Sequence, residues 1–396
     1  MRRLKVSRTT PAQYVVRAIL AQICTVASRL GCWSLTVFAV RLIGSVGQLS
    51  NAVRDRFANA AMMSSKDSRT RNAVALLIRR DRDCSSDLNL WLGKLCWRLG
   101  ELELARLLYR RTGELPGSSA QHELAESFCK LAQGILKGGI REAIEFQLDG
   151  LRLPDPTDGP LIVVPVSSQY LELFDLWNLQ CEKHISGLRL LLALDKPAVD
   201  ALSSGHGWRV LDLSSHFVFD NRGSLDPYGR LVLWMLRVLI LRELTRRRYT
   251  IYSLDLDAVM VGDMRTLERL LPACDIIAQI DYSIPMDVAR KLGFIVCCGL
   301  IVIRPSPDVD AFFDRYSLRT LREMNDQSAL NHLLLESGIK NHVTAKSYTS
   351  FMSQGLTWVL PDRSLVSRDL GYGRFVRHFV AGANSVEDVK RALDLS

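Results

Sequence analysis

Residues 249–263 read YTIYSLDLDAVMVGD, and this stretch decides the fold. A β-branched and aromatic segment, typical of a buried strand, ends in two carboxylates, Asp255 and Asp257, separated by one leucine. Because side chains alternate along a strand, positions i and i+2 point to the same side. We therefore expect the two carboxylates to converge at a strand end, where open α/β sheets bind their ligands.

Two carboxylates this close repel each other unless a proton or a divalent cation neutralises them. Mg2+ and Mn2+ favour oxygen ligands and bridge pyrophosphate groups. The pattern therefore predicts a Mn2+ or Mg2+ site that holds a nucleotide-diphosphate sugar. The alternative is that the Asp-x-Asp triplet caps a helix or lies in a solvated turn, as many such triplets do.

The composition is that of an ordinary globular protein. The chain has 396 residues, 48% hydrophobic and 23% charged, which is enough for two or three domains and argues against long disorder. The net charge of +9 favours acidic partners, namely nucleic acid, anionic lipid or phosphorylated substrates. No zinc-finger spacing or RNA-recognition signature occurs, so we do not expect nucleic acid to be a partner.

The nine cysteines include no Cys-x-x-Cys pair, and Cys297 and Cys298 are adjacent within an apolar segment. This pattern is typical of reduced thiols packed as small hydrophobic side chains. It predicts a cytoplasmic protein, since disulfides belong to oxidising compartments.

The segment 1–70 is predicted to form basic amphipathic helices followed by a connector. Arg17, Arg29 and Arg41 interrupt its apolar part, leaving uncharged runs of about eleven residues against the ~20 that a spanning helix needs. Such helices could lie peripherally on an anionic inner membrane face, or pack against the next domain.

Residues 71–153 resemble two tetratricopeptide-like helical hairpins. Gly100, Ala105 and Pro116 recur 38 residues later as Gly138, Ala143 and Pro154. That period is about four residues longer than the usual 34-residue unit. A generic helical bundle is the alternative. Either arrangement makes the N-terminal region all-α.

The composition of residues 154–160 (PDPTDGP) predicts a linker, and the hydrophobic pattern of the sequence changes after it. Short apolar runs alternate with helical patterns, which predicts a doubly wound, mainly parallel sheet over 161–396. The expected strands are 161–166, 188–194, 208–213, 249–254, 275–280 and 294–303, and the expected helices are 169–183, 228–245, 263–271, 308–320 and 325–336.

An ordered set of motifs carries a family resemblance. The set comprises Leu161–Val166, Leu194-Asp195, Tyr252–Asp257, Gly293–Pro305, Asn325–Asn331, Trp358–Pro361 and His378 with Gly382. In this order they resemble the nucleotide-diphospho-sugar transferase domain, including glycosyltransferase family 77. The resemblance covers about 60% of the chain and implies a GT-A fold, that is, a Rossmann-like sheet with an Asp-x-Asp metal site.

The loop after the first strand is a candidate nucleotide site. Val166 and Ser167 lead into a helix whose backbone N–H groups suit a nucleotide, and Tyr170 could stack on uracil. Asp195 ends the next strand in the same way, although a helix-capping serine pair and a plain Asp-Lys-Pro turn explain the two loops equally well. Arg237 lies where the family tends to have a basic residue that contacts a phosphate. The alternative is an arginine that buries its aliphatic part and extends its charged group to solvent.

Gly299 interrupts an apolar strand, and a glycine there often lets a ligand approach the backbone. The family usually has a small polar residue before this glycine, and Cys298 takes its place, as a packing residue rather than a nucleophile. Asp326 and Gln327 open a helix that could face the donor sugar, or simply follow an Asn325 cap.

His378 lies late in the chain, where related GT-A enzymes complete the metal shell with a histidine. Imidazole is an acceptable ligand for Mn2+, although a histidine between apolar residues is often merely packed. The resemblance thus implies a metal bound by Asp255, Asp257 and His378, with Asp255 also near the ribose.

The predicted function is metal-dependent transfer of a sugar from a nucleotide-diphosphate donor, expected to be a UDP-sugar. The resemblance implies retention of configuration, with Asp326, Gln327 or Asp281 steadying the oxocarbenium-like centre. The acceptor stays open among a glycan, a lipid-linked glycan and a protein. Two alternatives remain: a haloacid-dehalogenase-like phosphatase, whose strand-Asp-x-Asp motif fits locally, and a non-catalytic tetratricopeptide scaffold with a degenerate transferase domain.

Overall fold

The computed structural model describes residues 139–203, 207–216, 227–282, 285–323, 325–367, 373–379 and 389–390, together with Gly93, Ala105 and Leu108. The chain divides into two compact units, residues 1–129 and 130–396, and the second is described below. The predicted segment 1–70 and most of the tetratricopeptide-like region lie outside the described residues, so these assignments and the membrane contact stay predictions. None of the described helices is long and apolar enough to span a membrane.

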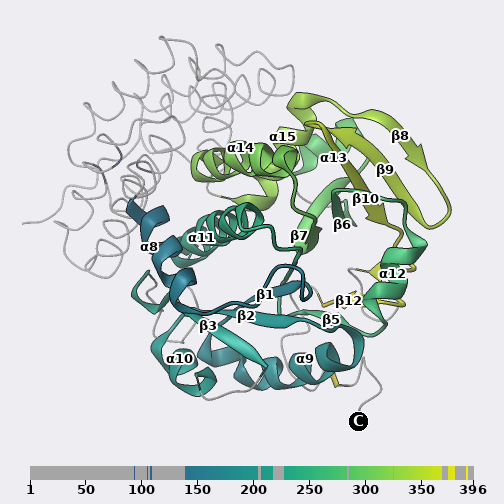
Figure 1. Cartoon of the computed structure of the whole chain (residues 1–396). Coiled ribbons are helices and arrows are strands. Elements are labelled where there is room, and N and C mark those ends of the chain that lie inside the picture. The colour runs from purple at the N-terminus through teal and green to yellow at the C-terminus, as the bar shows by residue number, and fades with distance from the viewer. Residues whose placement is uncertain are drawn as a thin grey trace, which may run out of the picture. The chain divides into compact units, whose positions relative to one another are not determined.

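A nine-stranded mixed sheet forms the core of the second unit (Figure 1). β1 pairs in parallel with β2 and β4, β2 pairs in parallel with β3, and β6 pairs in parallel with β10, while β7 runs antiparallel between β4 and β6. The carboxyl ends of β1 to β4, β6 and β10 therefore meet at one edge. In spatial order the strands are β3 (Trp208–Asp212), β2 (Leu188–Ala193), β1 (Leu161–Val166), β4 (Ile251–Leu254), β7 (Ile295–Ile303), β6 (Ile276–Asp281), β10 (Leu356–Pro361), β9 (Tyr348–Ser353) and β8 (Lys340–Thr344).

A second, three-stranded sheet in the order β11-β12-β5 brings distant parts of the chain together. Its strands are β11 (Val366–Ser367), β12 (Val376–His378) and β5 (Ala258–Met260). β12 pairs antiparallel with β5, directly after the Asp-x-Asp segment. β12 is thereby fixed beside the end of β4.

Helices cover both faces of the large sheet (Figure 1). α9 (Leu171–His184) and α10 (Lys196–Leu202) lie on one face, and α11 (Pro227–Arg246), α14 (Pro307–Glu323) and α15 (Asp326–Ser337) lie on the other. Ile162, Val164 and Val166 pack with Phe174 and Trp177 of α9 in one buried cluster. Every second side chain of a strand faces the same side of the sheet, so these three share a face. The remaining short helices are η1 (Ser168–Tyr170), η2 (Ser214–His216), α12 (Met264–Leu270) and α13 (Met286–Leu292).

α8 (Gly139–Gly150) and the linker after it are tied to the α/β unit. Arg247, just beyond α11, pairs through its Nη1 with Asp149 at 2.7 Å, and Tyr249 donates from its hydroxyl to the Pro154 carbonyl at 2.7 Å. This part of the predicted helical region therefore belongs to the second compact unit, which begins at Lys130.

The predicted α/β class of residues 161–396 is confirmed, and each of the six expected strands and five expected helices exists. Strand ends agree within two residues and helix ends within three. The sequence patterns did not reveal β5, β8 to β12, α10 or α13. β5, β11 and β12 have three residues or fewer, and all five residues of β8 are exposed, so neither alternation nor an apolar run marks them.

Candidate active site

The Asp-x-Asp segment forms a turn between β4 and β5. β4 ends at Leu254, and the Ala258 N–H donates to the Asp255 carbonyl at 2.9 Å. The Asp255 N–H in turn donates to the carbonyl of Gly299 in β7, also at 2.9 Å. We expected strand alternation to align the two carboxylates; a turn at the strand end places them instead.

His378 lies beside this turn because β12 pairs with β5. His378 is opposite Ala258 in that pairing, and the next N–H, of Phe379, donates to the Asp257 carbonyl at 2.8 Å. The Nε2 of His378 lies 3.1 Å from an Asp257 carboxylate oxygen. One ligand atom each from Asp255, Asp257 and His378 fall within 4.8 Å of one another. The three predicted metal ligands thus come together.

Two residues of the central sheet hold the His378 ring. A Cβ at Gly299 would lie 2.2 Å from the ring Cε1, so only glycine leaves room for the imidazole. The Oε1 of Gln279 in β6 lies 2.7 Å from the ring Nδ1. Gln279 was not among the predicted site residues; the available signal was an amide inside the apolar strand 276–281.

Opposing effects set the pKa values of Asp255 and His378. Burial and the neighbouring Asp257 raise the pKa of Asp255, although the Arg237 guanidinium counteracts them. Burial alone would lower the pKa of His378, but its hydrogen bonds to Asp257 and Cys297 raise that pKa to about 10. The site therefore holds two close carboxylates in partly desolvated surroundings, which a cation would relieve.

Arg237 connects Asp255 to Asp326. Its Nη1 lies 2.5 Å from an Asp255 oxygen, and its Nη2 donates to Asp326 at the start of α15. Arg237 is 5% exposed and Asp326 is 2% exposed. The arginine predicted to meet a phosphate therefore has carboxylate partners on both arms, and it fixes the end of β4 to α15.

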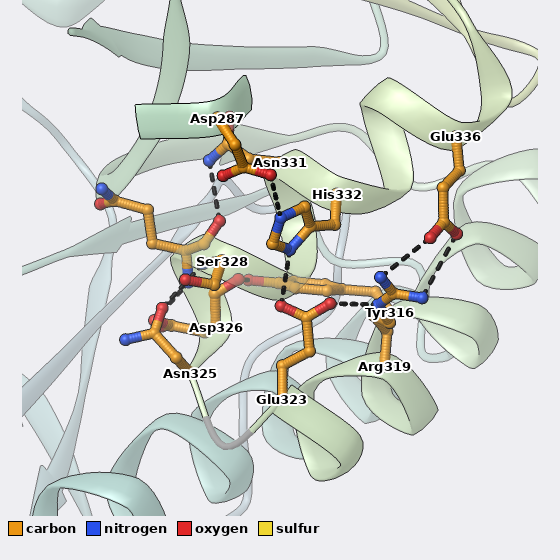
Figure 2. Close-up of polar contacts among 11 residues, drawn as sticks. Asp287, Tyr316, Arg319, Glu323, Asn325, Asp326, Ser328, Asn331, His332 and Glu336 are labelled. Atoms are coloured by element: carbon orange, nitrogen blue, oxygen red, sulfur yellow. Dashed lines mark hydrogen bonds and ion pairs between the residues drawn. The ribbon is translucent and has the colours of Figure 1, made fainter. Parts of the chain in front are cut away.

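The start of α15 is held by local hydrogen bonds (Figure 2). The Asn325 side chain accepts from the Ser328 N–H at 2.7 Å, which confirms that it caps the helix. Asn331 reaches β7, accepting from the Val296 N–H and donating to the Val296 carbonyl, both at 2.7 Å. The Asn331 amide also donates to the Gln327 carbonyl at 2.8 Å. The backbone that presents Asp326 and Gln327 is thus fixed to the sheet.

Asp281 ends β6 at the same sheet edge, separated from β4 by β7. Its carboxylate accepts from the Tyr282 N–H at 2.6 Å, and the side chain is buried. Cys298, in contrast, is a packed residue: its sulfur lies 3.5 Å from the Tyr316 hydroxyl, and burial raises the pKa of the thiol well above its usual range. A thiol so protonated is not a nucleophile.

The loops after β1 and β2 are joined by Asp195. Its carboxylate accepts from the Ser168 N–H at 3.0 Å and hydroxyl at 2.8 Å, and caps α10 by accepting from the Ala198 N–H at 2.8 Å. Val166 and Ser167 are buried beside this contact, whereas Tyr170 is 43% exposed. The residues predicted to bind the nucleotide in these two loops therefore lie together at the carboxyl edge of the large sheet. Tyr170 is the exposed aromatic ring among them.

Residues 189–368 match a family model described as nucleotide-diphospho-sugar transferase. This match covers the α/β unit from β2 to β11 and supports the predicted nucleotide-diphospho-sugar transferase domain. No curated protein sequence matches the chain.

Two solved structures are similar to parts of the chain. The glycosyltransferase GlyE of Streptococcus pneumoniae TIGR4 is 15% identical over 44% of this chain, with a TM-score of 0.28. The match spans 43% of the length of that structure. Apo mouse xyloside xylosyltransferase 1 is 10% identical over 56% of this chain and 98% of that chain, with a TM-score of 0.33.

Proposed function

We propose that the protein is a divalent-metal-dependent glycosyltransferase that moves a sugar from a UDP-sugar donor with retention of configuration. The observation that carries the proposal is the convergence of Asp255, Asp257 and His378 within 4.8 Å, inside a domain matched to nucleotide-diphospho-sugar transferases. Two carboxylates from one turn and a histidine from a strand much later in the chain supply two oxygens and one nitrogen, a set that suits Mn2+ or Mg2+.

The residues present fit such a cation. Both carboxylates lie at one turn, and burial and the charge of Asp257 raise the pKa of Asp255. A bound cation would offset this unfavourable environment for two negative charges. When bound, the cation supplies positive charge that neutralises the departing diphosphate. Arg237 does not compete for the diphosphate, because both its arms pair with carboxylates; it orients Asp255 instead.

The donor would lie along the carboxyl edge of the sheet. Tyr170, exposed after β1, offers a stacking surface for the base, and Asp195 fixes the loop before it by accepting from the Ser168 N–H. Val166 and Ser167 are the buried residues at the start of this loop, beneath the proposed donor. Among the residues nominated to steady the sugar centre, Gln327 has the partly exposed side chain, whereas Asp281 and Asp326 are buried. We therefore favour Gln327 for that role.

The test is a panel of UDP- and GDP-sugars assayed for hydrolysis with and without Mn2+. Wild-type protein should hydrolyse at least one UDP-sugar only with the metal, and Asp257→Ala should reduce the rate by about 100-fold or more. Asp200→Asn, which changes an exposed aspartate on α10, is the matched control and should leave the rate unchanged.

Three results would contradict the proposal. Equal turnover by wild type and Asp257→Ala would remove the metal site. Release of phosphate from simple phosphomonoesters, without sugar-nucleotide hydrolysis, would favour the phosphatase alternative. Folded protein that binds neither Mn2+ nor UDP would favour the scaffold alternative.

A further inference from the structure

Gln279 is a fully buried amide between the apolar residues Ala278 and Ile280 of β6. It lies in β6, where all six residues are buried, and its own exposed fraction is 0%. A buried amide costs free energy unless both its oxygen and its nitrogen are hydrogen-bonded. The Oε1 is 2.7 Å from His378 Nδ1, but the Nε2 has no hydrogen-bond partner among the described residues. Packing alone would favour an apolar residue here, so the amide needs another explanation.

The sheet is locally irregular at this point. In the pairing of β6 with β7, Ala278 is opposite Ile301 while Gln279 is opposite Cys297, so residues 298–300 of β7 form a bulge. Gly299 lies within that bulge, and its missing side chain admits the imidazole ring. Bulges commonly re-aim side chains next to active sites. This one lets His378 contact Gln279 across the sheet.

We propose that Gln279 is a positioning residue for the metal ligand His378: its side-chain oxygen accepts the Nδ1 proton, so that the Nε2 lone pair is left for the divalent cation beside Asp257. The inference rests on the proposed metal site. A neutral imidazole has one N–H and one lone pair, and an amide oxygen can only accept. In the neutral ring that binds a cation, the contact with Gln279 Oε1 therefore keeps the proton on Nδ1, and Nε2 is the nitrogen 3.1 Å from Asp257.

The opposite amide orientation gives the opposite result. With the Gln279 nitrogen toward His378, the amide would donate to Nδ1, and the proton of the neutral ring would lie on Nε2. That ring could not ligate a metal through Nε2. Metal binding and the orientation of the Gln279 amide are thus coupled, and the unpartnered amide nitrogen is the cost of the ligating orientation.

The first test compares Gln279→Leu with Gln279→Glu in the full chain, by titrating Mn2+ alone and following free Mn2+ by electron paramagnetic resonance. Leucine has similar volume but no acceptor, and should weaken Mn2+ binding by about 10- to 100-fold. Glutamate keeps an acceptor-only oxygen for Nδ1–H, and should bind within a few-fold of wild type. Metal-free thermal unfolding of both variants shows whether each is folded.

The second test reads the tautomer directly. In Mg2+-loaded protein labelled with 15N-histidine, the His378 ring should carry its proton on Nδ1, with its signal identified by its loss in His378→Gln. A proton on Nε2 would overturn the inference, as would equal Mn2+ affinity of wild type and a folded Gln279→Leu. Absence of Mn2+ binding by wild type would instead overturn the proposed metal site itself.

Discussion

Gly299 lies against the imidazole of His378 so closely that a methyl group on the glycine would be 2.2 Å from the ring Cε1. The same glycine accepts the Asp255 N–H through its carbonyl at 2.9 Å. Gly299 therefore contacts both ends of the Asp255–Asp257–His378 cluster, one through its backbone and the other through its missing side chain. The space for the third ligand exists only because this residue is glycine.

Gly299→Ala should displace His378 and weaken Mn2+ binding by about tenfold or more. Forcing a methyl group into this packed site should also lower the free energy of unfolding by about 1–3 kcal/mol. Calorimetric Mn2+ titration and urea unfolding measure the two effects. Gly139→Ala is the control, because nothing lies within 4 Å of a Cβ at that helix position. Unchanged Mn2+ affinity in Gly299→Ala would contradict the placement of His378.

Arg237→Met should destabilise the protein by about 3–5 kcal/mol, because it leaves the carboxylates of Asp255 and Asp326 without their buried partner. Urea unfolding measures the loss. Arg269→Met removes a 3.9 Å contact to Asp263 and a 3.0 Å hydrogen bond to the Thr266 hydroxyl, made by a side chain that is 76% exposed, and should cost less than about 1 kcal/mol.

A double variant tests whether Arg237 and Asp326 act as a pair. Arg237→Met with Asp326→Asn removes one charge from each side, so it should be more stable than the sum of the single effects predicts. Strict additivity would mean that the two side chains do not stabilise each other.

The sheet could be predicted because buried strands are visible as apolar runs. β1, for example, is the six-residue run LIVVPV, and five of the six expected strands agree with the observed strands within one residue at both ends. The order of the strands, and the antiparallel insertion of β7 between β4 and β6, depends on long-range pairing that no local pattern contains.

The site was only partly predictable, for the same reason. Asp255 and Asp257 are marked by the strand before them, but His378 reaches them through β12, a strand of three residues. Arg237 is visible in the sequence as a charge on an apolar helix, whereas its partner Asp326 is 89 residues away. A buried charge shows that a partner exists; the sequence does not show which one.

His332 should make stability depend on pH (Figure 2). It contacts Glu323 through Nδ1 at 2.7 Å and Asp287 through Nε2 at 3.2 Å. Burial would lower the pKa of His332, but the hydrogen bonds and charges of these carboxylates raise it. Burial would raise the pKa of Glu323, but His332 and Arg319 lower it.

The sign follows from linkage. The raised pKa of His332 stabilises the fold fully below its unfolded value, about 6.5, and this contribution is lost as pH rises through the folded pKa. The lowered pKa of Glu323 stabilises the fold above about 4.5 and that contribution is lost in acid. The pair should therefore contribute most between about pH 4.5 and 6.5.

His332→Gln isolates this contribution. The difference in free energy of unfolding between wild type and variant should be about 1–3 kcal/mol near pH 5.5 and shrink toward pH 9. Urea unfolding at several pH values gives the difference directly. A difference that stays constant with pH would mean that His332 is neutral in the folded protein throughout.

Tyr170→Ala should weaken binding of UDP without lowering stability. The ring is 43% exposed, so the fold loses little packing, whereas stacking of a base on an aromatic ring contributes about 1–3 kcal/mol. We expect the UDP dissociation constant to rise about tenfold or more in calorimetric titrations with Mn2+ present, and Tyr170→Phe, which keeps the ring, to stay near wild type. Leu179→Ala is the matched control, since that side chain of α9 is 49% exposed and lies outside the proposed site. If Tyr170→Ala binds UDP as tightly as wild type, the base stacks elsewhere and the loop after β1 contributes through its backbone alone.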